Sequence, residues 1–149
     1  MIAVKRVSPD DPDFTALVKL LDQNLAISDG EDHAFYDKFN KLASIKHTLI
    51  GYEDTIPVCC GAIKLFEADA FEIKRMFTLD TARGNAYAVV ILKHLETWAQ
   101  ELGATRCVLE TGINQHAAIA LYKKCGYQRT PNYGQYQGIA QSFCFEKIL

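Results

Sequence analysis

Hydrophobic and polar residues recur with two different periods along this 149-residue chain. Residues 2–7 alternate as in a short strand. Asp11 and Pro12 then provide the capping side chain and the preset backbone φ that are typical of a helix start. The apolar stripe of this helix consists of Phe14, Leu17, Val18, Leu21 and Leu25. After a break at residues 28–30 a second helix is predicted. Its apolar residues are Phe35, Phe39 and Leu42.

The middle of the chain predicts three antiparallel strands and one long helix. Between residues 48 and 77 the pattern has the two-residue period of strands, and residues 53–55 and 67–69 interrupt it as turns. Helical spacing returns at residues 88–102, and Gly103 suits the C-terminal cap. The apolar stripe of this helix consists of Ala88, Ile91, Leu92, Leu95, Ala99 and Leu102.

The last third of the chain predicts a strand, a helix and a final strand. These elements cover residues 106–111, residues 115–125, which Gly126 caps, and residues 142–148. No internal repeat or linker divides the sequence. We therefore expect one domain over residues 1–149, of the α/β class, in which a mixed sheet carries helices on both faces.

Charge and hydrophobicity argue against two classes of partner. The net charge is −2, and no stretch of lysine and arginine is long enough to bind a phosphate backbone. The sequence contains neither the apolar block of a signal peptide nor an apolar stretch of membrane-spanning length. We expect a soluble cytoplasmic protein that binds neither nucleic acid nor a membrane.

Cysteine and histidine spacing gives no indication of a metal site. The cysteines are Cys59, Cys60, Cys107, Cys125 and Cys144. Their number is odd and no CxxC pair occurs, so we interpret them as buried free thiols. The four histidines do not pair at helical spacing, and no metal is expected.

The turn into the long helix is a candidate site for an anion. Residues 83–88 read Arg-Gly-Asn-Ala-Tyr-Ala, so small side chains stand where a loop enters a helix. Backbone N–H groups and the helix dipole favour a phosphate at such a position. Small residues at a helix start are more often a sign of close packing, and spacing alone leaves both interpretations open.

Two residues are candidates for proton transfer. Glu72 lies in a predicted strand between apolar neighbours, where a carboxylate has a raised pKa that suits a general base. Lys74 lies on the same face, so a salt bridge is the alternative interpretation. Tyr122 lies one helical turn after Ala118 and is, on spacing alone, typical of a core tyrosine.

Together these segments resemble the GCN5-related N-acetyltransferase (GNAT) family. The resemblance rests on Ala70-Phe71-Glu72-Ile73, on Arg83-Gly84-Asn85-Ala86-Tyr87-Ala88, and on Gln115-x-x-Ala118-x-x-Leu121-Tyr122 followed by Gly126-Tyr127. It implies the acyl-CoA N-acyltransferase fold, in which a mixed, mostly antiparallel sheet of roughly six to seven strands is flanked by about four helices. It also implies acetyl-coenzyme A (acetyl-CoA) as co-substrate and direct attack by a primary amine.

The family pattern at the helix start is Gln or Arg, two variable residues, Gly, one variable residue, and then Gly or Ala. Arg83, Ala86 and Ala88 occupy the fixed positions, which implies that residues 83–88 bind the pyrophosphate of coenzyme A. Ala86 replaces the usual glycine, and its methyl group is expected to crowd the pyrophosphate. We expect the alanine to be tolerated, because a helix start does not by itself demand a positive φ.

The resemblance also implies roles for residues on the neighbouring elements. Glu72 corresponds to the general base, and Tyr122 to the acid that protonates the coenzyme A thiolate. Pantetheine pairs with the backbone of the strand that carries Glu72, where this strand diverges from the strand of Glu110. The residues at that point are Met76, Phe77 and Thr78. An amide at Asn114 or Gln115 bonds to the pantetheine, and the sequence leaves the choice open.

The acceptor site is expected between two distinctive regions. One is the segment of residues 29–36, in which Asp32 and its acidic neighbours attract a cationic amine and Tyr36 ends the segment. A charged helix start is, however, more often stabilised by its own dipole. The other region is the loop before the last strand, where Tyr133 and Tyr136 either wall a pocket or cover the sheet edge.

Two cations adjoin the proposed base. Lys74 shares the face of Glu72 and Arg75 lies on the opposite face, so one is expected to line the acceptor site and the other to meet solvent. The aromatic loop narrows the groove that an extended peptide needs, so a small amine is expected as acceptor rather than a protein tail.

Other functions fit parts of the same pattern. One is a module that senses acyl-coenzyme A without turnover, another is an acetyltransferase for a protein or peptide amine, and a third is an interaction domain that keeps only the fold. Retention of Glu72 and Tyr122 favours catalysis, whereas Ala86 favours weakened cofactor binding. Both a homodimer and a monomer are compatible with the sequence.

Overall fold

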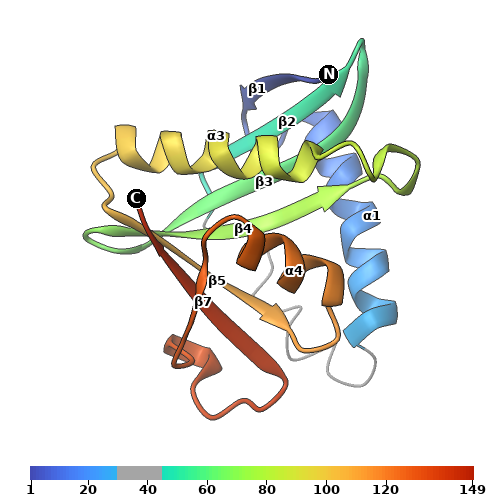
Figure 1. The fold of residues 1–149 in the computed structure, drawn as a ribbon. Coiled ribbons are helices and arrows are strands. Elements are labelled where there is room, and N and C mark those ends of the chain that lie inside the picture. The colour runs from blue at the N-terminus through green and yellow to red at the C-terminus, as the bar shows by residue number, and fades with distance from the viewer. Residues whose placement is uncertain (30–44) are drawn as a thin grey trace.

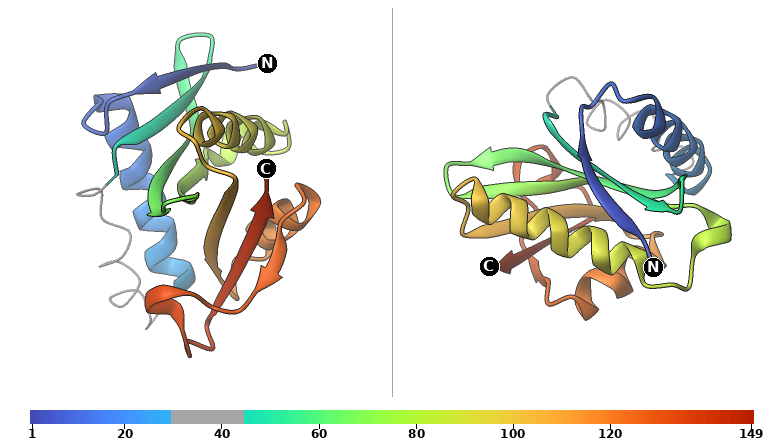
Figure 2. Two further views of the ribbon diagram at one scale, coloured as in Figure 1. Left: turned by 90° about the vertical axis from the view of Figure 1, so that its left-hand side faces the viewer. Right: turned by 90° about the horizontal axis from the view of Figure 1, so that it is seen from above.

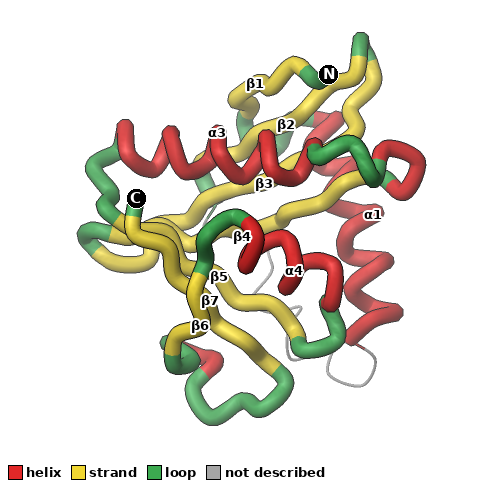
Figure 3. The backbone as a smooth tube through the Cα atoms, viewed as in Figure 1, coloured by secondary structure: helices red, strands yellow, loops and turns green. Residues whose placement is uncertain are grey.

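The computed structural model describes the backbone of residues 1–29 and 45–149 (Figure 1). The described part contains one seven-stranded sheet with the order β1-β2-β3-β4-β5-β7-β6. The strands are β1 (Ala3–Val7), β2 (His47–Glu53), β3 (Ile56–Glu67), β4 (Ala70–Thr78), β5 (Arg106–Gly112), β6 (Gln128–Thr130) and β7 (Ser142–Ile148). The α-helices are α1 (Pro12–Asp29), α3 (Tyr87–Glu101) and α4 (His116–Lys124). Figure 3 distinguishes the same helices and strands by colour.

The first four strands are antiparallel. β1 pairs with β2, β2 with β3, and β3 with β4. The turns predicted at residues 53–55 and 67–69 connect these strands, so the predicted meander is confirmed. Asp54 has a φ of 56° in the first turn, a conformation that aspartate tolerates better than most residues.

β4 and β5 run parallel and separate after a short paired stretch. Ala70–Glu72 pair with Arg106–Val108, and the pairing ends there. β4 then continues along β3 to Thr78, while β5 continues along β7 to Gly112. The two strands therefore form a wedge that opens toward their C-terminal ends. This is the divergence that the resemblance implied.

Helices cover both faces of the sheet (Figure 2). α1 packs on one face, where Phe14 is 0% exposed and the rest of its stripe, apart from the partly exposed Leu25, is buried with it. α3 and α4 pack on the other face, around Ile91, Leu92 and Leu95. Burial of these apolar stripes is the main favourable contribution to folding. The mixed α/β class with helices on both faces is confirmed.

The helix ends follow the predicted signals. Asp11 Oδ1 accepts hydrogen bonds from the backbone N–H groups of Asp13 at 2.9 Å and Phe14 at 3.2 Å, as a capping residue does. Gly103 after α3 and Gly126 after α4 both have a φ of 95°. This left-handed conformation ends a helix at low cost only when the residue is glycine.

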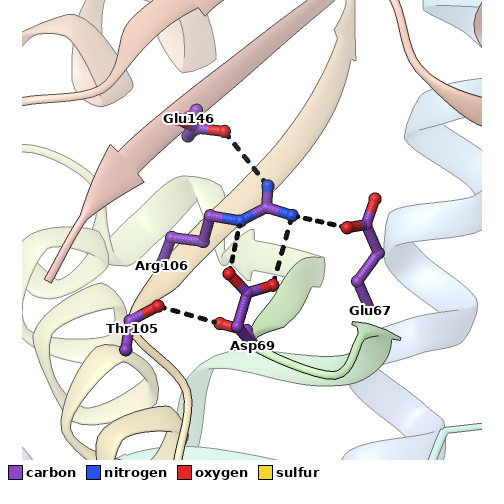
Figure 4. A network of polar contacts seen from close by, with 5 residues as sticks. All are labelled: Glu67, Asp69, Thr105, Arg106 and Glu146. Carbon is purple, nitrogen blue, oxygen red and sulfur yellow. Dashed lines mark hydrogen bonds and ion pairs between the residues drawn. The ribbon is translucent and has the colours of Figure 1, made fainter.

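An ion-pair network fastens the closed end of the wedge (Figure 4). Arg106 opens β5, and its Nη2 lies 2.8 Å from Glu67 Oε2 and 3.4 Å from Asp69 Oδ1 of the β3–β4 turn. Its Nη1 lies 3.1 Å from Glu146 Oε2 of β7. The arginine side chain is 18% exposed, so water shields these pairs only in part. The network joins the start of β5 to the end of β3, to the β3–β4 turn and to β7.

Several features differ from the predicted pattern or extend it. The polar strand β6 is three residues long and lacks the apolar alternation that would predict it. Leu102 ends the α3 stripe but is 45% exposed. The helix expected around Phe35, Phe39 and Leu42 lies outside the described residues.

Among the helices of the described part, none has the length and apolar character needed to cross a membrane.

Candidate active site

A β-bulge in β4 shapes the open side of the wedge. The register of β4 on β3 shifts at Arg75 and Met76, which stand together opposite Gly61. Arg75 has a φ of 58°, in the left-handed region that residues with a side chain rarely occupy. A bulge of this kind bends the strand and redirects its side chains, so the regular alternation of faces ends here.

A small cavity of about 140 Å³ occupies the wedge, and we call it the wedge cavity. β4 and β5 form two of its walls, and α1 and α4 contribute the others. Its lining comprises Leu21, Leu25, Ile73, Lys74, Arg75, Met76, Glu110, Thr111, Gly112, Gln115, Ala118 and Tyr122. The cavity therefore combines an apolar surface with the side chains of two basic residues, one acidic residue and a tyrosine.

Two further cavities extend from the wedge cavity along α4. The first, of about 380 Å³, shares Met76, Gln115 and Tyr122 with the wedge cavity. The second, of about 420 Å³, shares Thr78 and Arg83 with the first and reaches the start of α3. The three cavities adjoin one another between the N-terminus of α3 and the wedge, and together we call them the groove.

The loop before α3 has an unusual backbone. Gly84 has a φ of 85° and Ala86 a φ of 60°. Ala86 immediately precedes α3 and is left-handed, because the chain reverses there from the short 3-10 helix Asp80–Ala82 into α3. The expectation that this alanine escapes a positive φ is therefore wrong. Its methyl group carries a backbone cost that glycine would not.

The other predicted residues of this loop differ in their contacts. Arg83 is 57% exposed at the groove. Asn85 donates its side-chain amide to the carbonyl oxygen of Ala82 at 2.9 Å and does not line the groove. Tyr87 is buried, and its hydroxyl donates to a carboxylate oxygen of Glu53 at the end of β2. Of the predicted residues 83–88, those that line the groove are Arg83, Gly84 and Ala86 of the loop and Tyr87 and Ala88 of α3.

Residues predicted to meet pantetheine lie in the middle of the groove. Its lining includes Met76, Phe77 and Thr78 of β4. Gln115, at the start of α4, lines both this part and the wedge cavity, whereas Asn114 lines neither. Of the two candidate amides, Gln115 is therefore the one with access to a ligand in the groove.

Glu72 is buried and held on both carboxylate oxygens. Its exposure is 5%, and its Oε2 accepts a hydrogen bond from the Tyr133 hydroxyl at 2.5 Å. Its Oε1 lies 3.5 Å from Lys74 Nζ, so the salt bridge that was the alternative interpretation is present. Glu72 is not among the residues that line the groove.

Tyr122 belongs both to the core and to the groove. It is 6% exposed, its ring centroid lies 5.8 Å from that of Tyr127, and it lines two of the three cavities. Burial raises the pKa of the Tyr122 hydroxyl, and the nearby Cys125 and Glu110 raise it further. The hydroxyl therefore keeps its proton at neutral pH, as a general acid must.

Lys74 and Arg75 are both buried, at 8% and 6% exposure. The expectation that one of them meets solvent is wrong. The bulge changes the alternation of faces, and α1 covers the face to which Arg75 turns. There Arg75 Nη2 lies 2.5 Å from Asp22 Oδ1 of α1. Both residues line the wedge cavity.

The aromatic loop covers the sheet beside Glu72. Tyr136 is 1% exposed, and its ring meets that of Tyr133 edge-on at 5.9 Å. The ring of Tyr133 lies 4.6 Å from that of Phe66 in β3. Neither tyrosine lines the groove, so neither walls the three cavities that compose it. The other acceptor candidates, Asp32 and Tyr36, lie outside the described residues.

The groove contains residues to which the sequence analysis gave no role in a site. They are Leu21, Asn24 and Leu25 of α1, Glu110, Thr111 and Gly112 of β5, and Ala117, Leu121 and Lys124 of α4. Glu110 could have been recognised from the sequence, because it is an acidic residue that directly follows the apolar residues Val108 and Leu109 of a predicted strand. The α1 residues had none, since an apolar stripe does not reveal which of its members meets a cavity.

The five cysteines are free thiols, as predicted. Four of them are buried, and Cys125 is partly exposed. Burial raises the pKa of Cys60 to about 12, so this thiol is a poor nucleophile. Burial likewise raises the pKa of the Cys125 thiol. Within residues that the structure describes, no three histidine, cysteine or acidic side chains are grouped to hold a metal ion.

Comparisons with known proteins agree with this geometry. The sequence matches the Acetyltransferase (GNAT) family over residues 14–127. It is 30% identical over 150 residues to the IAA acetyltransferase of Azospirillum brasilense, covering 99% of this chain and 98% of the relative.

Two solved structures extend the comparison. A Klebsiella pneumoniae protein assigned as an acyl-CoA N-acyltransferase superposes with a TM-score of 0.84 at 32% identity, over 100% of this chain and 98% of the other. The PaiA N-acetyltransferase of Thermoplasma acidophilum, solved with coenzyme A, has a TM-score of 0.74 over 100% and 99% of the two chains. At 15% identity this second likeness shows the fold alone. The chain therefore belongs to the GNAT family of acetyltransferases, and it is an acyltransferase.

Proposed function

We propose that this acyltransferase moves an acetyl group from acetyl-CoA to the primary amine of a small molecule. The observation that carries the proposal is the position of Tyr122, which lines both the wedge cavity and the adjoining part of the groove. A hydroxyl at this junction stands where the thioester sulfur and the attacking amine have to meet. The match to the Acetyltransferase (GNAT) family supports the choice of co-substrate.

The start of α3 has the properties of a pyrophosphate site. Helix N-termini present backbone N–H groups and a favourable dipole to anions. A side chain added at Gly84 would meet nothing within 4 Å, so the backbone there is open to a ligand. Arg83 and Lys124 line this part of the groove and supply positive charge. Ala86 lines it too, and its methyl group reduces the room for the pyrophosphate.

The edge of β4 that faces the wedge suits the pantetheine arm. After Glu72 no described strand pairs with this edge, so its backbone N–H and C=O groups can meet a ligand. An extended amide-bearing arm can bind such an edge as an added strand. Met76, Phe77 and Thr78 would hold the arm on one side, and the Gln115 amide lies on the other wall.

The proposed chemistry is direct transfer. The amine nitrogen attacks the acetyl carbonyl carbon, the carbon–sulfur bond breaks, and the Tyr122 hydroxyl gives its proton to the departing thiolate. The nitrogen then loses the extra proton that it carries after the attack, and this proton restores the Tyr122 hydroxyl. Glu72 is the proposed base that first takes a proton from the acceptor ammonium. Glu110 is the alternative base, because it lines the wedge cavity and Glu72 does not.

The small size of the wedge cavity favours a small acceptor over a protein amine. The aromatic cover formed by Tyr133 and Tyr136 also favours a small acceptor, since it occupies a sheet face that an extended peptide would need. The acyl-CoA sensor is the second candidate function. Ala86 is the observation that favours it, because weakened cofactor binding would lower turnover.

The first test combines calorimetric titration with acetyl-CoA and a thiol-release assay against small amines, amino acids, polyamines and peptides. Binding accompanied by release with one class of small amine supports the proposal. Binding without release from any acceptor contradicts it in favour of the sensor. Release with peptides alone contradicts the small-molecule acceptor.

Three variants assign the proton-transfer residues. Tyr122→Phe should lower kcat by about 100-fold while the affinity for acetyl-CoA stays unchanged, because only protonation of the leaving group is lost. An unaltered kcat under conditions where chemistry limits the rate would remove Tyr122 from the mechanism. Glu72→Gln and Glu110→Gln form a matched pair. The variant that lacks the true base should lose turnover, and with it the pH dependence of the rate. The other variant should keep both.

A further inference from the structure

Two basic side chains and one acidic side chain line the wedge cavity. Lys74 and Arg75 come from β4, and Glu110 faces them from β5. The two cations are 8% and 6% exposed. A buried cation is costly unless carboxylates or other acceptors satisfy its donors. The hydrogen-bond partners of these two side chains therefore indicate which kind of ligand group the cavity can bind.

Lys74 has one ionic partner in the described structure, and that partner is distant. Its Nζ lies 3.5 Å from Glu72 Oε1, beyond the usual length of a charge-assisted hydrogen bond. The other oxygen of Glu72 is engaged by the Tyr133 hydroxyl at 2.5 Å. An ammonium group has three donors, so Lys74 keeps donor capacity beside the cavity.

Arg75 also keeps an unused donor. Its Nη2 is paired with Asp22 Oδ1 at 2.5 Å on the α1 side. Its Nε is fully buried and has no hydrogen-bond acceptor among the described residues. A buried guanidinium N–H without an acceptor is rare in folded proteins, because it forfeits the bond that water would give it.

We propose that the acceptor carries a carboxylate as well as its amine, and that Arg75 and Lys74 bind this carboxylate. This inference rests on the proposed function. The two carboxylate oxygens supply acceptors for the unused donors of both cations. The amine of the same molecule then lies toward Glu110 on the opposite strand, and its apolar part contacts Leu21 and Leu25. An amino acid has this distribution of charge, whereas a simple amine brings a third cation to two others.

The same cations have a different use if they stabilise the oxyanion that forms from the thioester carbonyl. In that case they act on every acceptor alike. Recognition of a carboxylate acts only on acceptors that possess one. The two roles are therefore separated by comparing acceptors that differ in the carboxylate alone.

The experiment uses matched pairs of an amino acid and its decarboxylated amine. Alanine is compared with ethylamine, methionine with 3-(methylthio)propylamine, and phenylalanine with phenethylamine, each by thiol release from acetyl-CoA. We expect kcat/KM to be about 10- to 100-fold higher for the acid of a pair that is accepted. Equal or better turnover of the decarboxylated amines overturns the inference and leaves the proposed function intact. Acetyl-CoA binding without turnover of either member overturns both.

Arg75→Gln and Lys74→Met test the residues. Each should lower the preference for the amino acid over its amine, measured as the ratio of the two kcat/KM values, by about tenfold or more, whatever its effect on turnover of the amine. Asp22→Asn is the control, because it breaks the ion pair of Arg75 from the α1 side without removing a cavity donor, and it should retain the preference for the acid. An equal loss for acid and amine in both cation variants overturns the assignment. If a variant fails to fold, the matched pairs on the unmodified protein still decide the inference.

Discussion

Two residues along the groove adopt a backbone conformation that their side chains disfavour. Arg75, in the β4 bulge, and Ala86, before α3, have φ values of 58° and 60°. A non-glycine residue in this region costs on the order of 1 kcal/mol, and it persists only when the surrounding structure enforces it. In both places the enforced geometry belongs to the groove: the bulge shapes the wedge, and the turn opens the N-terminus of α3.

Replacing Ala86 by glycine should relieve strain and enlarge the groove at once. We expect acetyl-CoA to bind more tightly by on the order of tenfold, because the methyl group leaves the pyrophosphate site. Stability should rise by at most about 1 kcal/mol, since the greater freedom of glycine in the unfolded chain offsets part of the relief. Calorimetric titration and thermal unfolding measure the two effects.

Ala88→Gly is the matched control for that substitution. Ala88 lies inside the first turn of α3, so glycine there should cost about 0.5–1 kcal/mol of stability. Weaker acetyl-CoA binding by the Ala86→Gly variant would show that the methyl group makes a favourable contact instead of crowding the ligand.

Single residues were predictable where a local cause sets them. The Asp11 cap and the apolar stripe of α1 depend on neighbours within one or two helical turns, and both are confirmed. The exposure of Lys74 and Arg75 was predicted wrongly, because the bulge depends on how β4 pairs with β3. Nothing in the local alternation reports such a shift in register.

At the scale of elements, the wedge requires that β4 and β5 stay paired at their N-terminal ends and stay apart at their C-terminal ends. β4 and β5 share only three residue pairs, so their backbone pairing alone is a weak joint. The Arg106 network reinforces it from the side of the β3–β4 turn and from β7 (Figure 4). We infer that this network fixes the angle at which the strands diverge, and with it the width of the wedge cavity.

Replacing Arg106 by methionine should therefore lower both stability and activity. We expect a loss of about 1–2 kcal/mol in the free energy of unfolding, because three carboxylates lose a common, largely shielded partner. KM for acetyl-CoA should rise through the altered wedge. Urea denaturation and steady-state kinetics measure these effects.

Arg6→Met is the control on the surface. Arg6 pairs with Glu101 at 2.6 Å, but the two side chains are 47% and 50% exposed, so its removal should cost less than about 1 kcal/mol. Equal losses in the two variants would show that the Arg106 network is no more than another surface ion pair.

Elements were predicted well where periodicity and turn residues carry the signal. The β2–β4 meander, α3, β5, α4 and β7 match the predicted ranges within a few residues. The wedge followed from the family resemblance and not from periodicity, because the separation of β4 from β5 is decided between segments far apart in sequence. The groove lining from α1 and β5 was missed for the same reason.

At the scale of the whole molecule, the sheet separates two apolar cores, and both contain thiols. Cys59 and Cys107 lie in the core under α3 and α4, and Cys60 lies in the core under α1. Burial raises the pKa of Cys59 to about 11 and those of Cys60 and Cys107 to about 12, from an ordinary value of 9.0. Tertiary packing on both faces therefore keeps these thiols protonated.

The raised pKa values of these buried thiols predict how the stability of the fold changes at alkaline pH. A thiol whose folded pKa is raised leaves the stability unchanged below pH 9, where both states are protonated. Above pH 9 the unfolded chain loses protons that the folded protein retains, so stability falls until pH 11 to 12, where the folded thiols titrate too. Each buried thiol contributes a slope on the order of 1 kcal/mol per pH unit in this window. The buried hydroxyls of Tyr122 and Tyr136, whose pKa values burial also raises, add to the fall above pH 10.

Urea midpoints measured by circular dichroism at pH 8, 9, 10 and 10.5 test this prediction. We expect a nearly constant midpoint up to pH 9 and a steep fall beyond it. Cys60→Ala should lessen the slope between pH 9 and 10.5, whereas Cys125→Ser, at the partly exposed thiol, should change it less. An identical slope in the Cys60→Ala variant and the unmodified protein would show that ion pairs, and not the buried thiols of the two cores, set the alkaline limit of the fold.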